Sequence, residues 1–181
     1  MKYEEIKQLR AFAWYDGIYL SIIWMASFAC FLAATWQSLL GQVSSLLILS
    51  TPFFVAFRLK KFRDTALEGA ISFNRACVYN LRVFFNAALL FSIMQYAYMA
   101  FVDHGKVAQI VTATMMRPEY DEVYKMMQVD KEQFLQFIPE AFSPLPMTLN
   151  SFIYEIIFGV FFGIIIAALM AKKKKNTQHV S

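Results

Sequence analysis

The chain has 181 residues, of which 59% are hydrophobic and 17% aromatic, and its mean hydropathy is +0.45. This composition excludes an ordinary soluble domain and is typical of an integral membrane protein. The net charge of +4 does not indicate a nucleic-acid partner, because the basic residues stand beside hydrophobic segments rather than among polar recognition residues. We expect a single integral membrane domain over residues 1–181.

Two hydrophobic segments joined by a tight hairpin open the chain. The first is expected at about residues 17–35, between Trp14 and Trp36, whose separation corresponds to roughly 33 Å of helix and so to a bilayer thickness. The residues before it are mixed in charge, which favours a retained anchor over a signal peptide. The second segment, about residues 39–57, contains Pro52, which should kink the helix without ending it.

A basic connection leads to the third hydrophobic segment, expected at about residues 83–102. Arg82 precedes this segment and should extend its charge to the lipid headgroups. In the long connection that follows, about residues 105–143, apolar residues recur at helical spacing. This connection predicts two or three short amphipathic helices that lie on the membrane surface or cap the bundle.

The fourth hydrophobic segment is expected at about residues 149–171, after Pro144 and Pro146 break the chain, and a tail of residues 172–181 follows it. Thirteen of the seventeen Lys and Arg residues lie in the amino-terminal segment, the basic connection and this tail. The positive-inside rule therefore places both termini in the cytoplasm and the long connection outside. The expected fold is all-α, a four-transmembrane-helix bundle with amphipathic helices in the outer connection between helices three and four.

Small residues follow a carboxylate along one face of the fourth segment. Glu155, Gly159, Gly163, Ala167 and Ala171 are spaced by four residues, which stacks them on one side of a helix. Such faces let helix backbones approach closely in lipid. We expect this face to pack against the third segment, although a GxxxG pair also serves homodimers.

Counting inward from the outer ends of segments three and four predicts which residues meet. Gln95 comes level with Glu155, Ser92 or Phe91 with Gly159, and Ala88 with Gly163. Gln95, or one of the nearby tyrosines Tyr96 and Tyr98, should then donate a hydrogen bond to Glu155. Glu155 itself either joins helices, forms a proton- or cation-linked site, or contacts a partner.

Basic residues at the cytoplasmic side are candidates for contact with anionic lipid, the alternative being a role in topology alone. They are Arg58, Lys60, Lys61, Arg63, Lys172 and Lys173. Catalytic motifs are absent: His104 and His179 are isolated, and no phosphate loop or zinc motif occurs. Cys30 and Cys77 show no metal-ligand spacing, so we expect no disulfide, metal or cofactor and a non-enzymatic protein.

Two stretches resemble a known family. These are "LEGAISFNRACVYNLRVFFNAALLFSIMQYAYMAFVD" and "IFGVFFGIIIAALMAKKKK". Both are similar to the bacterial membrane-protein family catalogued as domain of unknown function 4199, and the likeness extends over residues 17–175. The resemblance implies four transmembrane helices in a bacterial inner membrane and no established activity, so it assigns no functional residues.

Three functions remain open from the sequence. The first is a scaffold or accessory subunit that binds another membrane protein or lipid, alone or as a homo-oligomer. The second is a small transporter or proton-coupled carrier that uses Glu155 and requires a dimer interface, because four helices rarely enclose a path. The third is a helper in cell-envelope lipid or glycan metabolism, with its basic face near lipid phosphates.

Overall fold

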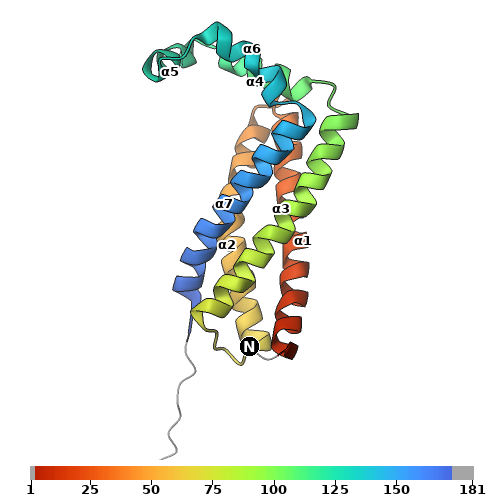
Figure 1. The fold of residues 1–181 in the computed structure, drawn as a ribbon, viewed down its shortest axis with the longest axis vertical. Helices are drawn as coiled ribbons and strands as arrows, with labels where there is room; N and C mark the ends of the chain where they lie inside the picture. Colours follow the sequence, from red (N-terminus) through yellow and green to blue (C-terminus); the bar gives the residue numbers. More distant parts are fainter. Residues whose placement is uncertain (1–2, 173–181) are drawn as a thin grey trace, which may run out of the picture.

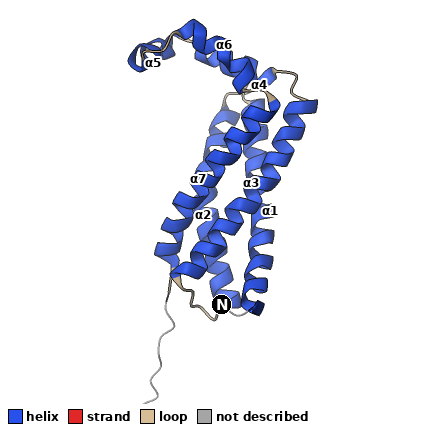
Figure 2. Ribbon diagram, viewed as in Figure 1, coloured by secondary structure: helices blue, strands red, loops and turns tan. Residues whose placement is uncertain are grey.

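The computed structural model describes residues 3–172, which form helices joined by turns and contain no strand (Figures 1 and 2). In chain order the elements are α1 (Tyr3–Ala33), α2 (Leu39–Ala66), α3 (Phe73–Phe101), α4 (Lys106–Met115), the 3-10 helix η1 (Pro118–Tyr120), α5 (Asp121–Met127), α6 (Lys131–Ala141) and α7 (Pro144–Met170). Four of them, α1, α2, α3 and α7, are long and apolar enough to cross a membrane. The expected all-α class with four long apolar helices is therefore confirmed.

The four long helices run side by side, alternately up and down, and the short helices form an arm at one end (Figure 1). We call residues 105–143 the arm and the end of the bundle that carries it the arm end. The opposite end is called the basic end, because Lys60, Lys61, Arg63 and Lys172 lie there. Helix α3 is central, since it packs against both α1 and α7, while α2 packs mainly against α1.

Three helices extend well beyond the hydrophobic segments that predicted them. Helix α1, expected from about residue 17, already begins at Tyr3. Helix α2 continues to Ala66, passing through Pro52, and α3 already begins at Phe73, so the basic connection shrinks to residues 67–72. The helical backbone thus runs past the expected limits at residues 57 and 83, because apolar character reports the thickness of a bilayer and not the end of a helix. Ser72 caps α3 by accepting a hydrogen bond from the Arg75 amide at 3.4 Å.

Helix α7 begins earlier than expected. Pro144 and Pro146 were predicted to break the chain before the helix, but both lie in its first turn. Proline is tolerated there because the first amides of a helix have no intrahelical acceptor, and its fixed φ suits the helix. The fourth apolar helix therefore starts five residues before position 149.

Aromatic rings and small polar contacts join the helices. Trp24 of α1 meets Phe91 of α3 edge to face at 6.2 Å between ring centroids, and Phe28 meets Tyr98 in the same way at 5.5 Å. The Ser27 hydroxyl of α1 donates to the Ser44 carbonyl of α2 at 2.9 Å. Such contacts hold helices together where lipid offers no hydrophobic drive.

The basic end is closed by backbone hydrogen bonds. Ile71, in the turn between α2 and α3, and Lys172, after α7, exchange two N–H to carbonyl bonds of 2.9 Å. Arg63 Nη1 also donates to the Met170 carbonyl at 3.2 Å, which satisfies one of the free carbonyls at the end of α7. The predicted lipid contact Lys173 lies outside the described residues.

The arm contains the predicted short helices and projects sideways from the bundle, with α5 farthest away (Figure 1). It does not cap the bundle. Within it, α4 packs against α6, the Tyr124 ring meets Phe134 at 5.5 Å, and Lys131 Nζ lies 2.5 Å from Asp121 Oδ1. The arm is therefore a structured element with contacts of its own.

Candidate functional site

The small face of α7 packs against α3 of the same chain. A Cβ placed on Gly159 would lie 2.6 Å from the Phe84 Cβ, so the two backbones are too close for any side chain at that position. One turn further toward the basic end, Asn80 Nδ2 donates to the Gly163 carbonyl at 2.8 Å. The antiparallel pair of α3 and α7 that the glycine spacing predicted is present, and this face is filled within the chain.

The predicted register between these helices was wrong by eight residues, or about two helical turns. Gly159 faces Phe84 rather than Ser92 or Phe91, and Gly163 faces Asn80 rather than Ala88. The count had placed residues 149 and 102 at the same level. Instead Pro144, the first residue of α7, lines the same pocket as Met99 of α3. The early start of α7 therefore accounts for most of the error.

A disulfide test distinguishes the two registers. In a background with Cys30→Ala and Cys77→Ala, the pair Asn80→Cys and Gly163→Cys should oxidise readily, because a Cβ on Gly163 would lie 3.4 Å from the Asn80 Cβ. The pair Ala88→Cys and Gly163→Cys should not, since those residues are eight positions apart in register. Mobility shifts on non-reducing gels measure both. Cross-linking of the second pair alone would contradict the structure.

The predicted hydrogen bond between Gln95 and Glu155 is absent from the structure. Gln95 is 2% exposed and its Oε1 has no hydrogen-bond partner, and neither Ser92 Oγ nor Glu155 Oε2 has one. In the observed register Glu155 comes level with Ala88, roughly 10 Å along the axis from Gln95. Together with two guanidinium nitrogens of Arg75 and the Asn80 Oδ1, six buried polar atoms of α3 and α7 lack a hydrogen-bond partner, which is unusual and costly.

Glu155 lines a crevice between α2 and α7. We call it the α2–α7 crevice; its volume is about 200 Å³, and its lining consists of Trp24, Ile48, Thr51, Phe91, Tyr154, Glu155 and Phe158. Ile48 and Tyr154 are 43% and 71% exposed, so the crevice opens on the side of the bundle. Trp24 Nε1 donates to Thr51 Oγ1 at 3.0 Å and fixes the indole in the wall.

A buried ion pair joins the first three long helices. Asp16 of α1 is 1% exposed and accepts a 2.5 Å hydrogen bond from Arg58 Nε of α2 and another from the Tyr79 hydroxyl of α3. Tyr79 in turn stacks on Phe62 of α2, with ring centroids 4.8 Å apart and the rings within 5° of parallel. Arg58 also lies over the Tyr19 ring, 5.2 Å from its centroid.

Asp16 was not singled out from the sequence, although a signal for the pair exists. Asp16 and Arg58 lie at equal distances of 21 residues from Gln37 in the tight turn between α1 and α2. In an antiparallel helical hairpin, residues equidistant from the turn come level, so opposite charges at those positions are expected to meet. The guanidinium of Arg58, a predicted lipid contact, is engaged by Asp16, and contact of this residue with lipid stays a prediction.

The remaining basic residues divide into engaged and exposed ones. Arg63 bonds Asp64 at 2.8 Å as well as the end of α7, and its side chain is 13% exposed. Lys60, Lys61 and Lys172 are exposed at the basic end. Within residues 3–172, no three His, Cys, Asp or Glu side chains lie close enough together to hold a metal ion. Contact with anionic lipid stays a prediction for the exposed lysines and for the two engaged arginines.

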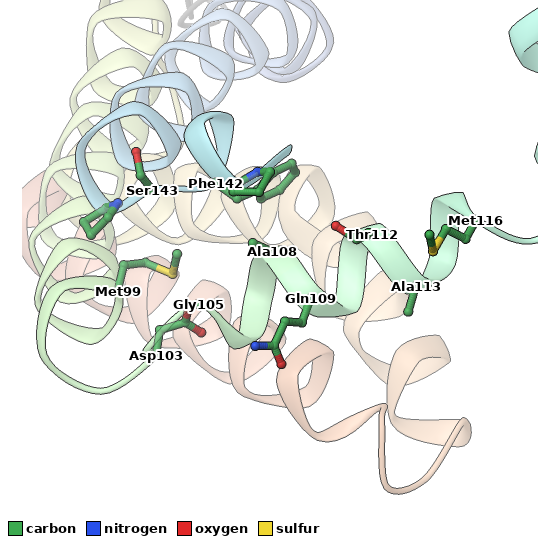
Figure 3. Close-up of a pocket in the computed structure, with 12 residues that line it drawn as sticks. Met99, Asp103, Gly105, Ala108, Gln109, Thr112, Ala113, Met116, Phe142 and Ser143 are labelled. Carbon is green, nitrogen blue, oxygen red and sulfur yellow. The ribbon is translucent and has the colours of Figure 1, made fainter. Parts of the chain in front are cut away.

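A hollow lies where the arm joins the bundle (Figure 3). Its volume is about 580 Å³, and Met99 of α3, Ala108 and Thr112 of α4, and Phe142 before α7 contribute to its walls. Asp103 is 1% exposed and caps α4, since its carboxylate accepts from the Val107 amide at 3.1 Å. The carboxylate therefore supports the joint, and the hollow presents a mainly apolar surface.

One protein-family model matches residues 15–172, a range that includes Asp16, Arg58, Tyr79 and Glu155. The family is described as protein of unknown function (DUF4199). This match confirms the resemblance noted from the two sequence stretches. No curated protein and no solved structure matches the chain.

Proposed function

Because the chain belongs to the DUF4199 family of proteins of unknown function, we propose its role from its own geometry. The protein is a non-enzymatic accessory subunit or scaffold that binds another membrane protein through its arm. The bundle is the rigid part of this design, since a buried ion pair links α1, α2 and α3 and backbone bonds close the basic end.

The observation that carries this proposal is the shape and surface of the arm. It extends away from the bundle (Figure 1). It exposes large apolar side chains, with Met126 at 77%, Met127 at 62% and Phe137 at 66% exposure. An apolar hollow of about 580 Å³ lies at its base. Exposed apolar surface beside a concave site is typical of protein interaction surfaces, and methionine adapts to irregular partners.

The proposed orientation follows from charge. Thirteen of the seventeen Lys and Arg residues lie outside the arm, within residues 2–10, 58–82 and 172–175, which are close in sequence to the helix ends at the basic end. We therefore place the basic end and both termini in the cytoplasm and the arm on the outer face of a bacterial inner membrane, which the chain crosses four times. A partner reached by the arm is then a membrane protein with an exposed outer surface.

Purification from native membranes in mild detergent tests the proposal. The unmodified chain should carry one foreign membrane protein at a constant molar ratio, determined by mass measurement of the complex. The variant Met126→Ser with Phe137→Ser should lose at least nine tenths of that partner, because both substitutions remove exposed apolar contacts while leaving the arm's internal packing in place.

A polar variant of the same arm provides the control. Glu122→Ala with Lys125→Ala changes exposed charges of α5 and should keep the partner. Recovery of the chain alone, or only as copies of itself, would reject the accessory role. Equal retention by both variants would show that the partner binds elsewhere.

A carrier that uses Glu155 is the second candidate function. The specific observation in its favour is the unpartnered Glu155 Oε2 in a crevice that opens on the side of the bundle. A carboxylate in such a place must be protonated or matched by a cation. The first requirement of this function is a cation bound at Glu155, and the lining of the crevice decides which cations fit.

A further inference from the structure

The charge of Glu155 has no counterpart inside the bundle. Its Oε2 is buried without a hydrogen-bond partner, and no Lys, Arg or His lines the α2–α7 crevice. Arg58, whose side chain is mostly buried in the core, is already bound by Asp16. A carboxylate with one oxygen shielded from water and no protein cation beside it favours a positively charged ligand.

The walls of the crevice are suited to an organic cation. Four aromatic residues line the crevice together with Glu155, one from α1, one from α3 and two from α7: Trp24, Phe91, Tyr154 and Phe158. Aromatic faces attract ammonium groups, and cages of this kind hold quaternary ammonium ligands. Thr51 and Glu155 supply too few oxygen atoms for a bare calcium or magnesium ion, which takes six or more.

The volume of the crevice and its opening further limit the class of ligand that fits. A volume of about 200 Å³ is smaller than the usual pocket for a drug-sized molecule, so it fits a head group rather than a whole amphiphile. Ile48 and Tyr154 at the opening are exposed on the lateral surface, where apolar helices face lipid. A ligand with an apolar body can thus enter from the bilayer and keep that body there.

We propose that the α2–α7 crevice binds lipophilic organic cations, with a quaternary or protonated tertiary ammonium group against Glu155 and among the aromatic rings. This site is separate from the arm and requires no partner protein. It also names the substrate class of the carrier considered above, although binding alone is what the geometry supports.

Tryptophan fluorescence tests the site directly. The chain has three tryptophans, and Trp14→Phe with Trp36→Phe leaves Trp24 in the crevice wall as the single reporter. Benzyltrimethylammonium is titrated into this protein in dodecyl maltoside, beside its neutral carbon isostere neopentylbenzene. The cation should give a saturable change in Trp24 emission, with an apparent affinity at least tenfold above that for the isostere.

Two variants in the same background complete the test. Glu155→Gln keeps the size of the side chain and should lower the apparent affinity for the cation at least tenfold. Glu122→Gln on the arm should leave the titration unchanged. Unchanged Trp24 emission before titration shows that the crevice is intact. Equal affinity for cation and isostere, or for Glu155→Gln and its parent, would overturn the proposal. Such a failure would leave the arm's partner untouched, because the arm takes no part in this measurement.

Discussion

Replacing Asp16 by asparagine should lower the free energy of unfolding by about 3–5 kcal/mol. The substitution keeps the shape of the side chain but leaves the Arg58 guanidinium buried without its counter-charge, and it weakens the acceptor of the Tyr79 hydroxyl. Arg58 and Asp16 side chains are only 18% and 2% exposed, so little water can compensate. Unfolding in mixed micelles of dodecyl maltoside and sodium dodecyl sulfate, followed by circular dichroism, measures the change.

An exposed ion pair of the same chain is the matched control. Lys131 and Asp121 on the arm have side chains 33% and 47% exposed, and Asp121→Asn should cost less than about 1 kcal/mol. The double variant Asp16→Asn with Arg58→Gln should recover part of the loss, because both charges are then removed. A cost below about 1 kcal/mol for Asp16→Asn alone would mean that the buried pair does not hold α1, α2 and α3 together.

Gly159→Ala should destabilise the bundle by about 1–3 kcal/mol, the usual cost of overfilling a packed interior. The added Cβ would lie 2.6 Å from the Phe84 Cβ and 2.7 Å from its Cγ, so α3 and α7 must separate or the Phe84 ring must move. Because Phe84 is 1% exposed and its ring also meets Phe158 at 6.2 Å, such movement disturbs several contacts. The same unfolding assay measures this loss.

Gly163→Ala is the control that distinguishes the steric clash at Gly159 from the general effect of replacing a helical glycine. A Cβ on Gly163 would meet the Asn80 Cβ at 3.4 Å, near ordinary contact, and the Asn80 bond to the Gly163 carbonyl would remain. Gly163→Ala should therefore change stability by less than about 1 kcal/mol, with the helix propensity of alanine offsetting mild crowding. An equal loss at both positions would contradict the close approach specific to Gly159.

Much of the fold was predictable, because a helix that crosses a bilayer needs a long apolar stretch that is visible in the sequence. Four apolar stretches predicted four long helices, and helical spacing in residues 105–143 predicted short helices there. Helix ends were less predictable, because helices continue past the apolar stretch when their next residues are charged, as Lys60 and Lys61 are in α2. The start of α7 was also placed too late, because Pro144 was expected to precede the helix and instead is its first residue.

The candidate site was predictable in its residues but not in its contacts. The spacing of Gly159 and Gly163 indicated a face of α7 that lies against α3 in the structure, whereas Glu155 lines the α2–α7 crevice. Which residues of α3 oppose them depends on where each helix starts, and an error of two turns there removed the expected Gln95 bond. Asp16 escaped notice because it stands at the edge of a hydrophobic stretch, where a charge needs no explanation until its neighbour on α2 is known.

The partners of two polar side chains of α3 have a consequence for the order of assembly during synthesis. The Tyr79 hydroxyl donates to Asp16 of α1, a helix that is synthesised earlier. The contacts among Asp16, Arg58 and Tyr79 can therefore form once α3 has been inserted. The neighbouring Asn80 amide must wait for the carbonyl of Gly163, 83 residues later. The first three helices can therefore assemble while the ribosome still translates the arm. Helix α7 then packs last against α3, where the Asn80 amide donates to the Gly163 carbonyl. Folding of this bundle thus ends with the docking of its final helix.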